Sequence, residues 1–315
     1  MRDPALIRML PDGRRMHAHD GPIDLIIEAN GSPQAVSAAY ESAARRFVSI
    51  LDGLCGELPL LRQPARKTSE RPRGAVARRM FAAVEPYGED CFITPMAAVA
   101  GSVAEEILES MTAAANLHRS YVNNGGDIAL HLGDRQSYKI GMVERPDRPS
   151  LFGSLEITAA DSARGIATSG WRGRSFSLGI ADAVTVLASC ASAADAAATV
   201  IANAVNLPDH RGITRVPARE ISLDSDLGDL LVTRGVEPLS QLEIDTALEN
   251  GARVATLLRE RGLIHSAALC LQKCVRVLPG FTTNSERDSR DGFPEPSATE
   301  LHAQLELAGR TNPHA

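Results

Sequence analysis

The segment from Gly165 to Val205 reads GIATSGWRGRSFSLGIADAVTVLASCASAADAAATVIANAV and places turn-forming, hydroxyl and guanidinium groups between two apolar elements. Ala183 to Ala188 alternates and is rich in β-branched residues, which predicts a strand. The alanine-rich run after it predicts a helix, with Ser189 or Ser192 as the candidate N-cap. So many backbone-permissive and hydroxyl residues between regular elements indicate a ligand-binding site.

The turn of this segment, TSGWRGR, begins at Thr168 and Ser169, which supply two hydroxyl groups. Gly170 provides flexible backbone, and consecutive N–H groups in such a turn can bind an anion. Arg172 and Arg174 carry planar guanidinium groups that suit bidentate contacts with phosphate. Arg172 and Arg174 are therefore candidates for contact with a phosphorylated ligand, although two arginines in a loop are more often ordinary surface charge.

The helix that follows carries Asp195 and Thr199 four residues apart, so both side chains project from one face. A carboxylate and a hydroxyl on one face can bind Mg²⁺, which prefers a few protein oxygens together with substrate phosphates. Alternatively, Thr199 bonds back to its own helix and Asp195 acts on the helix N-terminus. Cys190, just before the helix, is either a thiol whose pKa the N-terminus lowers or an inert buried thiol.

A second turn reads NNGGD, from Asn123 to Asp127, between strands expected at 119–122 and 127–132. Gly125 and Gly126 tolerate positive φ, so the pattern predicts a β-hairpin. Earlier in the chain, Gly101 and Ser102 lie in a helical pattern where the backbone can approach another element or a ligand closely.

The remaining periodicities complete an α+β domain in which amphipathic helices pack on a mixed or antiparallel sheet. Pro11-Asp12-Gly13 predicts the turn of a short hairpin, and a helix is expected from Pro33 to about Leu58. The other expected helices are 75–84 and 244–261, and the other expected strands are 23–29, 92–94, 139–143, 154–157 and 183–188.

The composition argues against several classes of partner. The 33 Lys and Arg residues against 39 Asp and Glu residues give a net charge of −6, which disfavours nucleic acid. No apolar run is long enough to span a bilayer and no signal peptide is recognisable, so a cytoplasmic protein without membrane contact is expected. The five Cys residues are scattered, which predicts reduced thiols. A homodimer is compatible with the sequence, which does not fix the oligomeric state.

Four blocks of the sequence are similar to a known family: ITPMAAVAGSVAEEIL, YVNNGGDIALHL, RGIATSGWRGRSFSLGIADAVTVLA and ADAAATVIANAV. Over roughly residues 20–275 the chain resembles the UPF0280 family, a branch of the ApbE-like superfamily. The resemblance implies an ApbE-like fold over residues 21–280, with an N-terminal extension at 1–20. The polar residues 281–315 are expected to form a mobile tail.

The FAD:protein FMN transferases of this superfamily bind FAD and Mg²⁺ and attach FMN to a Thr or Ser of a target protein. Three of their motifs resemble segments of this chain, and the resemblance implies that Asp195 and Thr199 bind the metal. It implies that the other two motifs and the adjacent arginines contact FAD or another phosphorylated nucleotide: Gly125, Gly126, Asp127, Thr168, Ser169, Gly170, Arg172 and Arg174.

Two departures from the transferase pattern weaken the case for transfer. The run Ser175 to Gly179 lacks the His of the transferases, and Ala100-Gly101-Ser102 stands where they carry a Lys-Gly pair. Without the His no side chain is available for proton transfer, and without the Lys none neutralises the charge on the phosphate. The sequence therefore predicts a ligand-binding protein and leaves open whether it is an enzyme. The alternatives are a protein of sulfur assimilation, related to persulfide or homocysteine chemistry with Cys190 as the sulfur carrier, and a structural partner protein.

Overall fold

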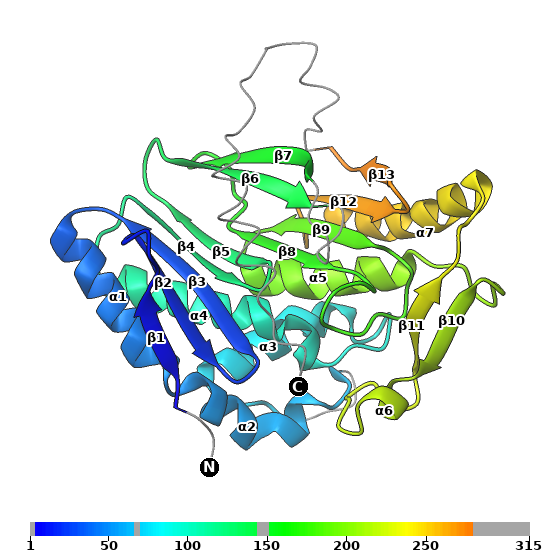
Figure 1. Ribbon diagram of the computed structural model, residues 1–315, viewed down its shortest axis with the longest axis horizontal. Coiled ribbons are helices and arrows are strands. Elements are labelled where there is room, and N and C mark those ends of the chain that lie inside the picture. The colour runs from blue at the N-terminus through cyan, green and yellow to red at the C-terminus, as the bar shows by residue number, and fades with distance from the viewer. Residues whose placement is uncertain (1–3, 66–69, 144–150, 280–315) are drawn as a thin grey trace, which may run out of the picture.

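A nine-stranded sheet in the order β1-β2-β3-β4-β5-β8-β9-β12-β13 forms the centre of the molecule (Figure 1). The computed structural model describes residues 4–65, 70–143 and 151–279 of the 315-residue chain. All neighbouring strands of the sheet pair antiparallel. The α+β architecture expected from the sequence is confirmed.

The strands of the main sheet are β1 (Leu6–Met9), β2 (Arg15–Asp20), β3 (Ile23–Asn30), β4 (Arg119–Asn124), β5 (Asp127–Leu132), β8 (Gly165–Ser169), β9 (Ala183–Ala188), β12 (Ser266–Leu271) and β13 (Cys274–Val277). Two further pairs stand outside it: β6 (Ser137–Val143) with β7 (Leu151–Thr158), and β10 (Ile213–Pro217) with β11 (Leu231–Val236). The helices are α1 (Pro33–Phe47), α2 (Ile50–Leu61), α3 (Ala75–Val84), α4 (Val99–Ala114), α5 (Ala191–Ala204), α6 (Ala218–Ile221) and α7 (Gln241–Glu260), with 3₁₀ turns η2 (Glu85–Tyr87) and η3 (Pro95–Ala98).

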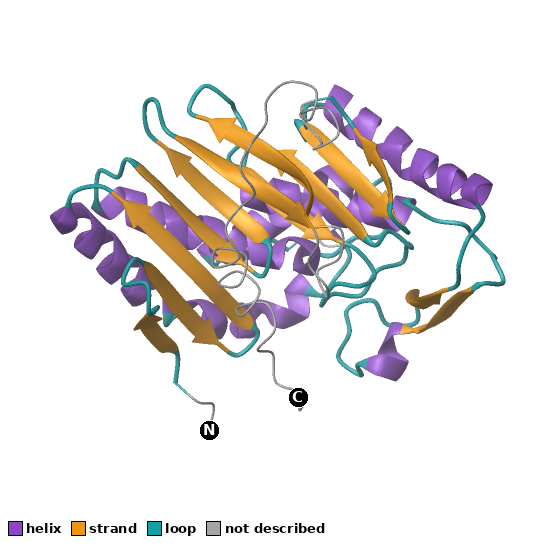
Figure 2. Ribbon diagram, turned by 45° about the horizontal axis from the view of Figure 1, so that its top comes forward, coloured by secondary structure: helices purple, strands orange, loops and turns teal. Residues whose placement is uncertain are grey.

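The helices gather on one face of the sheet (Figure 2). Helix α4 packs on β4 and β5, α5 packs on β8 and β9, and α7 packs on α5 and β12. The opposite face of the sheet receives the β6–β7 pair, whose Leu155 and Ile157 share a buried cluster with residues of β5 and β8. The alanine-rich composition of α5 allows this close packing, because the side chains of Ala194, Ala197 and Ala198 are fully buried.

Two segments before residue 21, Leu6–Met9 and Arg15–Asp20, contribute strands to the sheet. Strands β1 and β2 form the hairpin expected around Pro11-Asp12-Gly13, with Met9 opposite Met16. Strand β2 then pairs with β3 through Asp20 and Ile23, so the boundary proposed at residue 21 falls within a continuous hairpin. The predicted tail at 281–315 lies outside the described residues.

Two of the secondary-structure predictions were wrong in detail. The single helix expected from Pro33 is divided into α1 and α2, because the Ser49 hydroxyl donates to the Arg46 carbonyl at 3.1 Å and competes with the helical ladder. The expected strand at 92–94 does not form. The Ile93 carbonyl instead accepts the Ala65 N–H at 3.0 Å, and the Thr94 hydroxyl bonds to Asp226, so these residues make single tertiary contacts.

Helices α4 and α5 approach most closely at Gly101. A Cβ atom on Gly101 would lie 2.3 Å from the carbonyl oxygen of Ala191 and 2.9 Å from the backbone nitrogen of Ser192. Backbone atoms cannot move aside as the end of a flexible side chain can. The glycine is therefore required for contact between the two helices.

We predict that Gly101→Ala lowers the free energy of unfolding by about 2 kcal/mol or more, because the added methyl group overpacks this contact. Gly53→Ala in α2 is the matched control, since no atom lies within 4 Å of the added Cβ there. The control should raise stability by about 0.5–1 kcal/mol through helix propensity. Urea denaturation of both variants measures the difference, and equal effects would contradict the packing argument.

Candidate functional site

The residues singled out from the sequence meet at one edge of the sheet, where β4, β8 and β12 end and β5, β9 and β13 begin. The β4–β5 turn, the loop after β8 and the β12–β13 turn lie along this edge. Helix α5 crosses beneath it on the helical side. Three segments distant in sequence thus border one region (Figure 1).

The NNGGD segment is the expected hairpin turn. Gly125 and Gly126 have φ values of +65° and +114°, and the Gly126 N–H donates to the Asn123 side-chain oxygen at 2.8 Å. A Cβ on Gly125 would lie 1.8 Å from a terminal nitrogen of Arg174. The guanidinium of Arg174 therefore rests directly on the glycine turn, which brings two of the motifs together.

Two carboxylates that interact electrostatically come from β5 and α5. Asp127, at the start of β5, accepts the Thr168 N–H at 3.2 Å, and Asp195, on α5, accepts the Gly101 N–H at 2.9 Å. Burial raises the pKa of Asp127 to about 7, although the Thr168 N–H and the Arg174 charge oppose the shift. Burial also raises the pKa of Asp195 well above its usual range, and the neighbouring charge of Asp127 adds to this effect. The pair concentrates negative potential where a cation would relieve it.

Thr199 lies one turn beyond Asp195 on the same face of α5. In α4 and α7, Thr112 and Thr246 donate to the carbonyl four residues back, at 3.1 and 2.7 Å. Within the described part of the chain no such bond is found for Thr199. The alternative considered from the sequence, in which the Thr199 hydroxyl bonds back to its own helix, is therefore wrong.

Asp195 acts on a different helix from the one expected. Its carboxylate accepts N–H groups of Ala100 and Gly101 in the first turn of α4, and so caps that helix instead of α5. In return, Glu105 of α4 accepts the Ser192 N–H at the start of α5, at 2.9 Å. Ser189 and Ser192 do not cap α5: Cys190 is the N-cap residue and no side-chain cap bond forms there.

Arg172 and Arg174 occupy different environments. The Nε of Arg172 donates to Oδ1 of Asp182 at 2.6 Å, and its guanidinium stacks 4.3 Å from the centre of the Trp171 ring. Asp182 is 4% exposed and also accepts the Trp171 indole N–H and the Gln272 N–H. Arg172 thus anchors the loop, whereas Arg174 extends over the glycine turn. Asp182 was not identified from the sequence, because its partners are distant along the chain.

The remaining residues of the TSG turn are held by the strands. The Thr168 hydroxyl bonds to the Thr185 hydroxyl at 3.0 Å, and Ser169 is partly buried beside them. A Cβ on Gly170 would lie 2.5 Å from the Asp182 carbonyl oxygen, so glycine is required at this approach. The main chain here is fixed before any ligand binds.

The loop from Ser175 to Gly179 is fixed by amide groups in place of a histidine. Asn203, near the end of α5, accepts from the Ser177 hydroxyl at 3.2 Å and from the Leu178 N–H at 2.9 Å. The Ser177 carbonyl also accepts the Thr233 N–H at 2.9 Å. The loop therefore offers hydroxyl and amide groups but no general base.

The thiol of Cys190 is not activated. Burial raises its pKa, and the nearby Glu105 charge raises it further. The lowered pKa considered from the helix N-terminus is therefore wrong, because burial and the Glu105 charge outweigh the hydrogen bonds from the Ser192 hydroxyl and the Ala193 N–H, which favour the thiolate.

Asp127, Asp195 and Thr199 all carry hard oxygen atoms. Mg²⁺ prefers such oxygen ligands over nitrogen or sulfur. Across residues 4–65, 70–143 and 151–279, no group of three or more His, Cys, Asp or Glu side chains is arranged to hold a metal. An ion at this place would keep coordination positions for phosphate oxygens or water.

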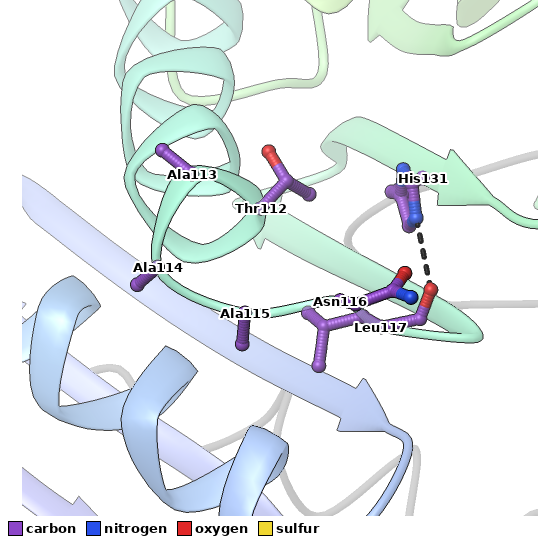
Figure 3. A pocket seen from close by; sticks show the side chains of 7 residues that line it. All are labelled: Thr112, Ala113, Ala114, Ala115, Asn116, Leu117 and His131. Carbon is purple, nitrogen blue, oxygen red and sulfur yellow. Dashed lines mark hydrogen bonds between the residues drawn. The ribbon is translucent and has the colours of Figure 1, made fainter.

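A separate hollow of about 330 Å³ lies at the far end of α4 (Figure 3). Its lining is Thr112 to Leu117 and His131, whose Nε2 is 3.2 Å from the Leu117 carbonyl oxygen. The carboxylate pair lies at the opposite end of this helix, so the hollow is not part of the same site. As to membranes, the described chain contains no helix with both the length and the apolar character needed to cross one.

We predict that Asp182→Ala lowers the free energy of unfolding by about 3 kcal/mol, because Arg172, Trp171 and Gln272 would lose a common buried acceptor. Asp229→Ala is the control, since it removes an exposed ion pair with Arg219 and should cost less than about 0.5 kcal/mol. Thermal unfolding measures both. A small effect at Asp182 would show that the loop is not anchored there.

Comparison with known proteins identifies the relatives of this chain. A family model described as AbpE bacteria matches residues 7–278. A UPF0280 protein of Methanopyrus kandleri is 37% identical over 184 residues, which cover 57% of this chain and 69% of that protein. A UPF0280 protein of Methanothermobacter thermautotrophicus is 37% identical over 154 residues, 47% of this chain and 57% of that protein. The matched region therefore covers between 57% and 69% of the length of these two relatives.

Solved structures with a similar arrangement include the ApbE protein of Thermotoga maritima, with 12% identity and a TM-score of 0.42 over 87% of this chain and 96% of that one. The flavinyl transferase ApbE of Pseudomonas stutzeri, in its apo form, has 12% identity and a TM-score of 0.42 over 91% and 97% of the two chains.

Proposed function

The chain belongs to the UPF0280 family and to the family described as AbpE bacteria, and we propose that it binds FAD or another phosphorylated nucleotide together with Mg²⁺. The observation that carries the proposal is the pair of half-buried, interacting carboxylates of Asp127 and Asp195 near the arginine-bearing loop. Two desolvated negative charges close together destabilise a protein unless a cation compensates them.

Asp195 and Thr199 would hold the ion from one face of α5, and Asp127 would supply a further oxygen from β5. Bound Mg²⁺ would neutralise the two carboxylates and charge on the ligand's phosphates. Arg174, which rests on Gly125, adds a positive charge at the rim of the same region. The fixed N–H groups of the glycine and TSG turns provide positions for phosphate or ring contacts at close range.

Flavin transfer is not part of the proposal. The Ser175 to Gly179 loop is tied to Asn203 and contains no group that exchanges protons near neutral pH. The Lys of the transferases is replaced at Ala100 and Gly101, whose N–H groups are taken by Asp195. The site therefore supports binding more than it supports proton transfer.

One test of the proposed site concerns the charge of Asp195. In Asp195→Asn the amide oxygen can still accept the Gly101 N–H, while the charge that attracts the cation is lost. We expect the Mg²⁺-dependent affinity for FAD, measured by calorimetry, to fall at least about tenfold. Thr199→Val should weaken it as well, whereas Thr246→Val, which removes a hydroxyl that bonds only within α7, should not.

Asp195→Asn should also change how the stability of the protein depends on pH and on Mg²⁺. Folding raises the pKa of both carboxylates, so the metal-free protein loses stability as pH rises; for Asp127 this loss falls between about pH 4 and about pH 7, and Mg²⁺ should restore the stability. Asp195→Asn should flatten this loss and abolish the Mg²⁺ effect. An unchanged response to Mg²⁺ would exclude the carboxylate pair as the cation site.

Another test of the proposed site concerns Arg174. Arg174→Gln should weaken FAD or ADP binding about tenfold or more and reduce its dependence on salt, because a charge-assisted hydrogen bond to phosphate is lost. Arg253→Gln, on the exposed face of α7, is the charge-matched control. Equal affinities for the two variants would remove Arg174 from the site.

A further inference from the structure

The β10–β11 pair projects beside the main sheet and is fastened to the candidate site (Figure 1). Its Thr233 N–H donates to the Ser177 carbonyl, in the loop that follows Arg174. A bulge between Thr214 and Arg215 shifts the register, and Arg215 then pairs with Thr233. The extra residue of the bulge is Arg234 on β11, and Arg215 stays in register opposite Thr233.

Arg215 is a partly buried cation without a carboxylate partner. Its Nη2 donates to the Asn206 side-chain oxygen at 2.5 Å, and no ion pair within 4 Å is found for it in the described ranges. Burial lowers its pKa, and the more distant Asp209 only partly opposes this effect. Arg79 and Arg172, which are buried to a similar degree, each pair with carboxylates. A desolvated guanidinium that has only a neutral acceptor has unused capacity for an anion.

Thr233 provides an independent observation. It is 3% exposed, and its hydroxyl has no hydrogen-bond partner among the described residues. As the cross-strand partner of Arg215, it presents its side chain on the same face of the ribbon, with Cβ atoms about 5 Å apart by the geometry of antiparallel pairs. A buried hydroxyl without a partner costs free energy, so its retention beside an unpaired guanidinium points to a shared ligand.

We propose that Arg215 and Thr233 form an anion subsite that binds a phosphate or carboxylate group. The guanidinium supplies charge and paired N–H donors, and the hydroxyl donates a further hydrogen bond. Asn206 holds the arginine in place: its side-chain oxygen accepts from Arg215, and its amide donates to the Leu178 carbonyl at 3.1 Å. The subsite therefore borders the loop of Arg174 and is separate from the carboxylate pair.

The proposal is tested on the full-length chain carrying Arg174→Gln, which removes the other candidate phosphate contact. Inorganic phosphate and, separately, succinate are titrated while the Nε–H resonance of Arg215 is followed by NMR. Its assignment comes from the signal that disappears in Arg215→Gln. We expect a saturable shift with at least one of the two anions, and the responding anion identifies the chemical class. Thr233→Val should weaken the affinity about fivefold, and Arg219→Gln, an exposed control on α6, should leave it unchanged.

Thr233→Val also separates binding from structure. Without an anion it should be at least as stable as the parent chain, because the hydroxyl it removes has no partner. No saturable shift with either anion overturns the proposal, as does equal affinity in Thr233→Val. If Arg174→Gln alone abolishes phosphate binding, the anion subsite is overturned and the nucleotide site is supported. If the protein fails to bind FAD with Mg²⁺ but still shows the saturable anion shift, the nucleotide site is overturned and the anion subsite stands.

Discussion

The contact between α4 and α5 at Gly101 is the constraint on which the candidate site depends. Because no Cβ fits there, the first turns of the two helices lie together, and each helix supplies the acceptor for the other's free N–H groups. Asp195 of α5 accepts from α4, and Glu105 of α4 accepts from α5. The helix ends are thus satisfied by charged side chains from outside, which the macrodipole favours.

This arrangement gives Asp195 two tasks that pull in opposite directions. As a cap, its charge is stabilised by the α4 N–H groups, but its burial opposite Asp127 raises its pKa and disfavours ionisation. A cation would resolve the conflict, because it compensates both carboxylates without displacing the cap. A carboxylate retained for helix capping alone would be better placed away from a second negative charge.

The local sequence pattern was sufficient to predict the strands and the helix that carry the motifs. The NNGGD hairpin and the Asp195–Thr199 spacing follow from period and turn chemistry, so the sequence placed them correctly. The sequence could not reveal that Asp195 caps α4, because the two segments are far apart along the chain. It could not reveal that Asp182 anchors Arg172, because that contact depends on how the loop between β8 and β9 folds. The break at Ser49 was missed for a related reason: one hydroxyl bond to the backbone outweighed a continuous apolar stripe.

The β12–β13 turn and Asp182, which lie outside the sequence motifs, hold the edge of the sheet where the candidate site lies. The β12–β13 turn uses Gln272 and Lys273 at φ values of +45° and +71°, a conformation that costs non-glycine residues free energy. Asp182 offsets this cost by accepting the Gln272 N–H at 2.6 Å, and the same carboxylate accepts from Arg172. A single buried acid, Asp182, therefore connects the strained β12–β13 turn to the loop that carries Arg172. A preorganised edge of this kind favours ligand affinity, because little main-chain entropy remains to be lost on binding.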